Sequence, residues 1–237
     1  MKNRYPRLHH HLAARFSPDG AFGLHLTIGA AAMLLAAWVF GEIADEVFDN
    51  DTLALLDDYL AQWFHSYRHS AWTPFMLFIT HVHQQAGISA MVLALAIYLR
   101  VRKADYWLAG LILAVPGGML LNVLLKYTFQ RARPSFDEPL VTLATYSFPS
   151  GHASGAMLFY GFLAAYLVWT IPRNGVRAAV LLGAMTMVLL VALSRVYLGA
   201  HYLSDVLAGM AFGIAWLAVC ITAISTLRRR RAARAGQ

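Results

Sequence analysis

The stretch that decides the fold is residues 149–171, PSGHASGAMLFYGFLAAYLVWTI. It joins a short polar turn to the apolar run 153–171, which is long enough to cross a membrane, since a span needs about 20 mostly apolar residues. Five further apolar runs of this kind occur along the chain: 22–41, 74–99, 106–126, 177–194 and 205–227. The sequence therefore predicts an all-α, polytopic membrane protein with six transmembrane helices.

The composition of the chain supports this class. Its 237 residues are 59% hydrophobic and only 13% charged, whereas about a quarter of the residues of a soluble domain are charged. From its length, the chain is predicted to form a single membrane-embedded domain, residues 1–237. The one cysteine, Cys220, lies inside an apolar run, so we expect it to be inert packing, and no disulfide is possible.

The polar segment 42–73 is predicted to be an outer loop that carries a short amphipathic helix. Apolar residues recur on one face of this helix: Leu53, Leu56, Leu60 and Trp63. Polar residues fall on its other faces: Asp57, Asp58 and Gln62. A helix with this pattern lies on the membrane surface. Farther along, Pro116-Gly117-Gly118 predicts a kink in the third span.

Basic residues divide unevenly between the two sides of the predicted membrane. The tail 1–20, the loops 100–105 and 172–177, and the tail 228–237 together hold 14 of the 19 lysines and arginines, but only two of the 12 acids. Since loops in the cytoplasm are rich in Lys and Arg, both termini are expected there. The chain is thus predicted to be a multi-pass protein of the cytoplasmic (inner) membrane.

Two short stretches invite other interpretations. Arg228–Arg231, in a chain with a pI of about 9.8, suggests nucleic-acid binding, but a basic segment next to a span is better explained by the anionic cytoplasmic leaflet. The triplet His9-His10-His11 suggests a metal site, but a solvated cytosolic tail explains it better. We therefore expect no nucleic-acid partner and no metal.

Three polar clusters interrupt the apolar chain, all on the predicted outer side, and the first is Lys126 with Arg133-Pro134. A lysine supplies a point charge, and an arginine supplies a planar fork that can bind two phosphate oxygens. Cations at the end of a span are equally explained by snorkelling toward water. Taken alone, this cluster does not define a site.

The second cluster, Pro149-Ser150-Gly151-His152, comes directly before an apolar helix. Backbone N–H groups at a helix N-terminus bind anions, and a glycine there lets an oxyanion approach closely. Ser150 is also a good N-cap residue. His152 is placed to protonate a departing oxygen.

The third cluster holds Arg195, His201 and Asp205. Residues four apart share one face of a helix, so the carboxylate can hold one nitrogen of the His201 imidazole and make the other a better nucleophile or base. His201 can activate water or attack phosphorus directly, and the residues alone leave both routes open. A metal site is the competing interpretation, but three converging cations would repel a divalent ion.

In residue type, spacing and order, the three clusters resemble the signature of the type 2 phosphatidic acid phosphatases. The motifs run from Lys126 to Asp205, and six spans with outward motifs are similar to these integral membrane phosphatases over most of the chain. The same signature occurs in vanadium haloperoxidases, but those proteins are soluble. The resemblance implies a metal-independent and cofactor-independent lipid phosphatase.

The resemblance also implies a role for each residue. His201 is the nucleophile that forms a phosphohistidine, Asp205 orients it, and His152 protonates the leaving group and then activates water. The other residues of the three clusters hold the phosphoryl oxygens: Lys126, Arg133, Ser150, Gly151 and Arg195.

The substrates implied by the family are undecaprenyl diphosphate, phosphatidylglycerophosphate, phosphatidic acid and a lipid A phosphate, dephosphorylated at the outer face. The patch His81–Gln85 suggests that His81 and His83 line the lipid cavity, although hydrogen bonds between helices explain them equally well. A second class of function stays open, a phospholipid binder or transporter that does not hydrolyse its ligand. The sequence does not determine the oligomeric state.

Overall fold

The computed structural model describes residues 23–49, 52–68, 71–141 and 143–235, so the tail 1–20 with His9–His11 lies outside the described residues. Within those ranges every regular element is helical. In chain order the elements are α2 (Leu24–Phe48), α3 (Thr52–Ser66), α4 (Thr73–Val82), α5 (Gln85–Val101), α6 (Asp105–Ile112), the π-helical turn η1 (Leu113–Gly117), α7 (Gly118–Phe129), α8 (Gly151–Thr170), α9 (Asn174–Tyr197) and α10 (Leu203–Ala235).

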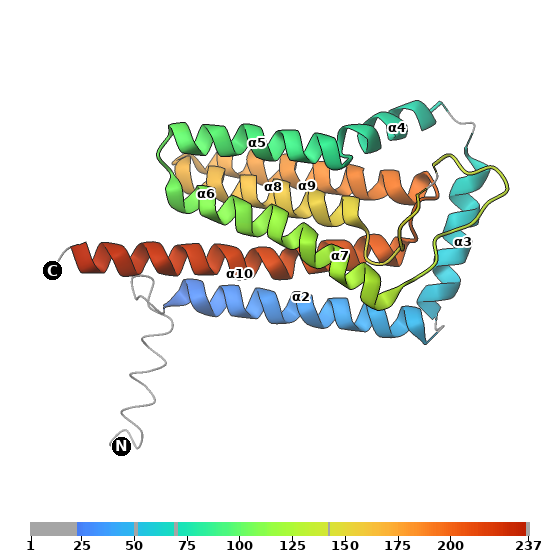
Figure 1. Ribbon diagram of the computed structural model, residues 1–237, viewed down its shortest axis with the longest axis horizontal. Coiled ribbons are helices and arrows are strands. Elements are labelled where there is room, and N and C mark those ends of the chain that lie inside the picture. The colour runs from blue at the N-terminus through green and yellow to red at the C-terminus, as the bar shows by residue number, and fades with distance from the viewer. Residues whose placement is uncertain (1–22, 50–51, 69–70, 142, 236–237) are drawn as a thin grey trace, which may run out of the picture.

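The predicted polytopic membrane fold is confirmed. In the described part of the chain, five helices are long and apolar enough to span a bilayer: α2, the continuous run Asp105–Phe129, α8, α9 and α10. The pair α4 and α5 passes the same test together and is the sixth candidate, although the two helices are bent by 50°. Figure 1 shows these helices side by side, with the short helix α3 crossing one end of the bundle.

The predicted span 74–99 is therefore two helices, and the break lies at His83 and Gln84. Gln84 has an extended backbone and begins α5. The imidazole Nδ1 of His83 donates to the carbonyl of Ile79 at 2.8 Å. Apolar composition alone did not reveal this break, because a histidine side chain takes part in ending α4.

The predicted outer loop 42–73 begins too early, because α2 continues to Phe48. Ala44 packs with Phe148 and Ala208, and Phe40 and Ile43 contact the same cluster. These contacts keep the last turns of α2 helical. The acidic residues of these turns, Glu42, Asp45 and Glu46, are exposed. The amphipathic helix predicted for this segment is α3.

On α3 the buried acid is Asp57, which is 1% exposed, whereas Leu56 and Trp63 are 42% and 45% exposed. The sequence predicted a surface helix with an apolar stripe, and these exposed apolar residues fit it, but the burial of Asp57 was not predicted. The face that packs inward also contains Ala61, which is buried. Asp57 is accommodated there by an ion pair with Arg131, so the face cannot be assigned from apolar residues only.

The predicted kink at Pro116 is a π-helical turn inside one continuous span. Proline has no backbone N–H, so a carbonyl of the preceding turn loses its helical partner. The indole Nε1 of Trp216 on α10 donates to the Leu113 carbonyl at 3.0 Å. The widened turn is thus stabilised from a neighbouring helix, and Pro116 itself lines a cavity described below.

Close packing of α8 on α10 sets the geometry at one end of the bundle. A Cβ atom on Gly209 of α10 would lie 2.7 Å from the Ser150 carbonyl oxygen and 3.0 Å from Ser154 Oγ. Ser154 Oγ in turn donates to the Gly209 carbonyl at 3.1 Å. Glycine is therefore required at 209 for the two helices to approach this closely.

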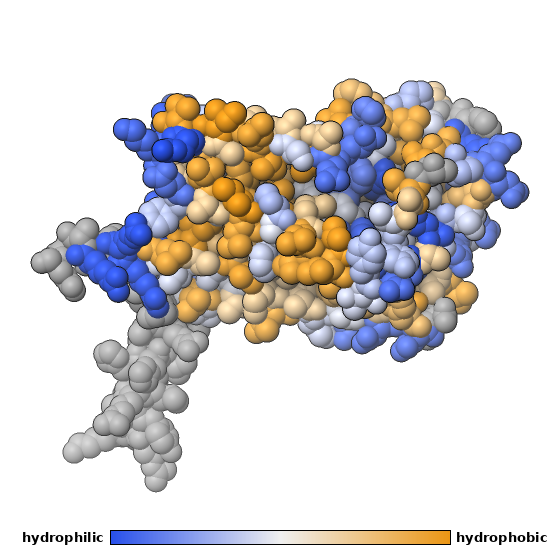
Figure 2. All heavy atoms as spheres, in the orientation of Figure 1, coloured by the Kyte–Doolittle hydropathy of each residue, from blue (hydrophilic) through white to orange (hydrophobic). Residues whose placement is uncertain are grey.

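The opposite end of the bundle is basic. Helix α10 carries the arginines of the predicted tail as a continuation of the span, to Ala235. Arg228 lies over the ring of Trp169 at 4.5 Å, and Arg231 lies over that of Tyr106 at 5.3 Å. Figure 2 shows hydrophobic atoms gathered between two hydrophilic ends. Cys220 is buried, in the core formed with Trp107, Leu111 and Phe162.

Candidate active site

The three polar clusters meet at the end of the bundle where α7 and α9 finish and α8 and α10 begin (Figure 1). The predicted residues gathered there are Lys126, Arg133, Ser150, Gly151, His152, Arg195, His201 and Asp205. The loop 130–150 crosses this end between α7 and α8. Residues far apart in the sequence therefore share one site.

The N-terminus of α8 is built as the sequence predicts. Ser150 is the N-cap, and its Oγ accepts from the N–H of Ala153 at 3.5 Å. Its own N–H donates to the carbonyl of Asp205 at 2.9 Å, which ties the start of α8 to that of α10. The first N–H groups of the helix lack intrahelical partners, so Gly151 and His152 begin a segment with anion-binding character.

His201 is held in a defined tautomer. Its Nε2 is 3.0 Å from Nη1 of Arg133, which can only donate, so Nε2 accepts and the proton lies on Nδ1. Nδ1 faces Asp205 Oδ2 at 3.3 Å and Ser147 Oγ at the same distance. Burial lowers the pKa of His201 to about 3, against the opposing effect of Asp205, so the imidazole is neutral at physiological pH. This arrangement leaves a lone pair on Nε2.

Asp205 is fully buried and accepts from several donors. Oδ2 accepts from the Tyr202 N–H at 3.0 Å and from the Ser147 hydroxyl. Oδ1 accepts from Arg131 Nη1 at 2.6 Å. Burial acts to lower the pKa of Arg131, but the carboxylates of Asp205 and Asp57 outweigh it and raise that pKa. Asp205 is therefore an ionised carboxylate with a fixed orientation.

Two of the predicted phosphate-binding cations organise the loop above the site. Lys126 Nζ donates to the Tyr146 and Ser147 carbonyls at 2.7 and 3.1 Å. Arg133 donates through Nε to the Thr145 carbonyl and through Nη1 to the Ala200 carbonyl, both at 2.6 Å. Burial lowers the pKa of Arg133. Both cations reach the cavity while also ordering the backbone around it.

Two buried nitrogen atoms in the site have no hydrogen-bond partner among the described residues: Nε2 of His152 and Nε of Arg195. Arg195 is 2% exposed, and its Nη1 donates to Thr80 Oγ1 on α4. An unsatisfied buried polar atom costs about 1–3 kcal/mol. His152 lines the cavity described below, so its unsatisfied atom indicates where a polar ligand belongs.

A cavity of about 560 Å³ connects this polar end to the apolar bundle. Its polar lining includes His201, His152, Arg133 and Lys126. Its apolar lining comes from α5, η1 and α7: Ile88, Val92, Val115, Pro116, Leu120 and Val123. Leu120 and Val123 are also exposed on the outside of the bundle. The cavity therefore suits a ligand with an anionic head and an apolar tail.

The two histidines of the His81–Gln85 patch are placed differently. His83 is buried and lines the cavity, with Nδ1 donating to Ile79 and Nε2 accepting from the Tyr160 hydroxyl at 2.7 Å. His81 is exposed, lies 3.2 Å from Gln84 through Nδ1, and is not among the cavity residues. Part of the patch therefore lies at the cavity, through His83 and Gln85, while a role for His81 stays a prediction.

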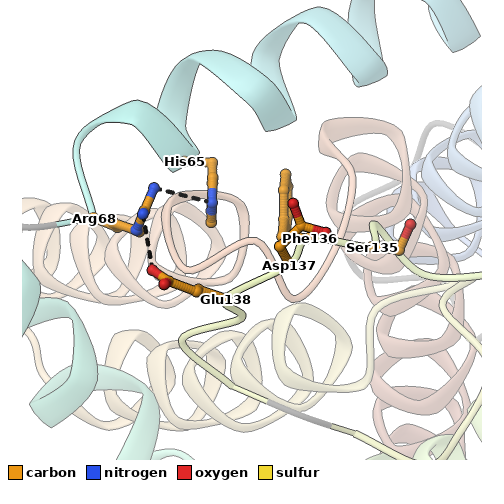
Figure 3. A pocket seen from close by; sticks show the side chains of 6 residues that line it. All are labelled: His65, Arg68, Ser135, Phe136, Asp137 and Glu138. Atoms are coloured by element: carbon orange, nitrogen blue, oxygen red, sulfur yellow. Dashed lines mark hydrogen bonds and ion pairs between the residues drawn. The ribbon is translucent and has the colours of Figure 1, made fainter.

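A second pocket, of about 500 Å³, lies beside the loop after Arg133. Figure 3 shows Arg68 reaching Glu138 at 2.9 Å and His65 at 3.3 Å. The acids that line this pocket oppose a phosphate. Phe136 stacks on His65 at 4.1 Å and also lies against Gly199, whose φ of 65° permits the turn before His201. The loop thereby supports the active-site turn from outside.

Sequence reasoning missed four residues that contact the site: Asp57, Thr80, Arg131 and Ser147. A signal existed for Asp57, because Leu53, Asp57, Leu60 and Phe64 recur at helical spacing just as the predicted apolar stripe does. The spacing of residues in the sequence did not point to Thr80, Arg131 or Ser147. Their partners in the site are at least 54 residues away in the chain.

The chain is similar to a protein family and to several curated proteins. The model of the PAP2 superfamily matches residues 105–229. Phosphatidylglycerophosphatase B of Bacillus subtilis (strain 168) is 38% identical over 141 residues, which are 57% of this chain and 67% of that protein. A lipid A 1-phosphatase of Rhizobium johnstonii is 38% identical over 116 residues, 45% of this chain and 42% of that protein.

A solved structure is also similar. The PAP2 type phosphatidylglycerolphosphate phosphatase from Bacillus subtilis superposes with a TM-score of 0.74 at 26% identity. The superposition covers 80% of this chain and 94% of that one.

Proposed function

The chain belongs to the PAP2 superfamily, and we propose that it hydrolyses the phosphate esters of membrane lipids through a phosphohistidine on His201. The observation that carries this proposal is the neutral, buried imidazole whose Nε2 lies at the cationic end of an apolar cavity. A nucleophile needs an available lone pair and an orienting partner, and His201 has both. The whole chain forms one catalytic domain and requires no cofactor.

In the first step, Lys126, Arg133 and Arg195 bind the phosphoryl oxygens together with the N-terminus of α8. Arg133 now donates to Nε2 of His201, so an incoming phosphoryl oxygen has to take over this donor before Nε2 can attack. Binding of the phosphate therefore also frees the Nε2 lone pair of His201 from its hydrogen bond with Arg133. The fixed donors then stabilise the charge of the transition state.

In the second step, Nε2 of His201 forms a bond to phosphorus while the bond to the leaving oxygen breaks. His152 gives a proton to that oxygen, and Asp205 balances the positive charge that develops on the imidazole of His201. Water then attacks the phosphohistidine with His152 as the base, which releases phosphate and restores the imidazole. General acid–base help of this kind contributes about 10²–10⁴ in rate.

The proposed location is the cytoplasmic membrane, with both termini in the cytoplasm and the site at the outer face. The support is the distribution of charge: the α5–α6 and α8–α9 turns and the end of α10 are basic and lie at the end remote from the site (Figure 1). The positive-inside rule assigns that end to the cytoplasm. A lipid of the outer leaflet would then enter the cavity through its apolar side.

We assign phosphatidylglycerophosphate as the first substrate to test, because the similar Bacillus subtilis sequence and the similar Bacillus subtilis structure are each named as a phosphatase of this lipid. Undecaprenyl diphosphate and phosphatidic acid share the same chemistry, a phosphoryl head on an apolar tail. All three fit a cavity whose lining is cationic at one end and apolar at the other.

The test is release of inorganic phosphate by the purified full chain in detergent, from these three lipids and in the presence of EDTA. We expect release without metal, and acid-labile phosphate on the protein after a rapid quench. His201→Ala should lose both signals, and near-normal activity in that variant would contradict the mechanism. Lipid binding by the wild type without phosphate release from any substrate would instead favour the binder or transporter.

A further inference from the structure

An acid outside the three polar clusters is connected to the nucleophile. Asp57 lies on α3, which crosses the end of the bundle, and its side chain is buried. Its Oδ1 accepts from the Ser204 N–H at 3.0 Å, and Oδ2 accepts from the Ser204 hydroxyl and from Arg131 Nη2 at 2.9 Å. A buried carboxylate with this many donors is a built feature of the fold.

Arg131 connects Asp57 to the Asp205–His201 pair. One nitrogen, Nη2, donates to Asp57, and the other, Nη1, donates to Asp205 Oδ1 at 2.6 Å and to Ser204 Oγ at 2.7 Å. The guanidinium also lies over the ring of Tyr202 at 4.3 Å. One cation therefore serves two buried carboxylates, on the side of Asp205 away from His201.

The second carboxylate changes what Arg131 does to Asp205. A guanidinium facing one carboxylate tends to bind both of its oxygens. Because Asp57 engages Nη2, Arg131 contacts only Oδ1 of Asp205, and Oδ2 remains directed at His201 Nδ1. Asp57 also offsets the charge of Arg131, so that Asp205 keeps a net negative charge opposite the imidazole.

Asp57 also fixes the start of α10. The Ser204 N–H belongs to the first turn of this helix, where N–H groups lack partners and a negative charge is favourable. The carboxylate of Asp57 thus acts as a cap supplied by another helix. It docks α3 on the turn that carries Tyr202 and Asp205.

We propose that Asp57 and Arg131 are positioning residues for the reaction, which hold Asp205 so that its Oδ2 orients His201. This inference rests on the proposed phosphatase function. It assigns to the outer helix α3, which contributes no residue to the three clusters, a role in aligning the nucleophile.

The test compares Asp57→Asn with the wild type in the phosphate-release assay. Asparagine keeps the shape and the acceptor for the Ser204 N–H but removes the charge that holds Arg131. We expect kcat to fall about 10- to 100-fold through misalignment of reacting groups, with KM within about twofold. The thermal midpoint in detergent should fall, because the buried Arg131 loses one of its two carboxylate partners, so kcat is measured well below that midpoint. Glu46→Gln, which neutralises an exposed acid of α2, is the matched control and should leave kcat unchanged.

A double-variant cycle with Arg131→Gln separates alignment from folding. If the two residues act as one unit, Asp57→Asn with Arg131→Gln should lose no more activity than the worse single variant. Unchanged kcat in Asp57→Asn, or a lower thermal midpoint with normal kcat, would overturn the inference and leave the phosphatase function standing. Absence of phosphate release from the wild type and Glu46→Gln alike would overturn the proposed function, and this inference with it.

Discussion

The contact between α8 and α10 gives a prediction that substitutes no residue of the three clusters. In Gly209→Ala, the new Cβ would lie 2.7 Å from the Ser150 carbonyl oxygen, whereas ordinary contacts begin at 3.4 Å. The start of α8 must then retreat by about 0.7 Å, the difference between these distances. Because a backbone oxygen is the obstacle, a side-chain rotation cannot relieve the clash.

Two magnitudes follow from this displacement. Overpacking of a tight contact lowers the free energy of unfolding by about 1–3 kcal/mol. The displaced segment carries the general acid, His152. Helix α10 carries Asp205, which orients the nucleophile His201. The distance between His152 and His201 therefore increases. A shift of about 1 Å between reacting groups lowers rates by about 10²-fold, and we therefore expect kcat to fall at least about tenfold.

The assay is phosphate release together with thermal unfolding in detergent. The control is Gly183→Ala on α9, where a Cβ meets nothing within 4 Å. Alanine favours a helix over glycine by about 1 kcal/mol, so this variant should be as stable as the wild type or more stable, with the same kcat. If Gly209→Ala keeps kcat within about twofold of the wild type, or if Gly183→Ala loses as much, the reasoning is refuted.

Three further predictions address the chemistry. His152→Ala should lower kcat by about 10²–10⁴ while still binding lipid, as measured by phosphate release and by lipid binding in parallel. Thr80→Val removes an acceptor from the buried Arg195, so kcat/KM should fall about tenfold and the free energy of unfolding by about 1–3 kcal/mol, checked by steady-state kinetics and thermal unfolding. In the folded protein the pKa of His201 is about 3, below its ordinary value of 6.5, so the unfolded chain binds the extra proton between these values. The free energy of unfolding should therefore fall as pH falls from 6.5 toward 3, by at most about 1.4 kcal/mol per unit, and His201→Gln should show a shallower decline in pH-dependent unfolding.

The membrane fold was predictable because each span carries its own signal. Apolar length alone placed the six candidate spans, and the structure differs mainly at their ends. Where it differs, a long-range contact is responsible: α2 extends to Phe48 because Ala44 packs on Phe148 and Ala208. Pro116 gave a correct sign of irregularity, but the π-helical form depends on Trp216 from another helix.

The orientation of α3 shows the limit of hydrophobic patterning. Two stripes on this helix, one through Leu56 and one through Asp57, have similar helical spacing. Patterning identified the apolar stripe of a surface helix, but it did not reveal that the ion pair with Arg131 turns Asp57 inward. A buried charge is acceptable only when its partner is present, and the partner lies 74 residues farther along the chain.

The sequence by itself determined the class of the protein, its spans and the three polar clusters, because membrane length, helix capping and motif spacing are all local properties of the chain. Only the tertiary structure decided how those clusters face one another. The tautomer of His201, the orphan nitrogens of His152 and Arg195, and the link from Asp57 to Asp205 all depend on contacts between residues distant in sequence. Such contacts follow from the packing of helices against each other, which no single segment encodes.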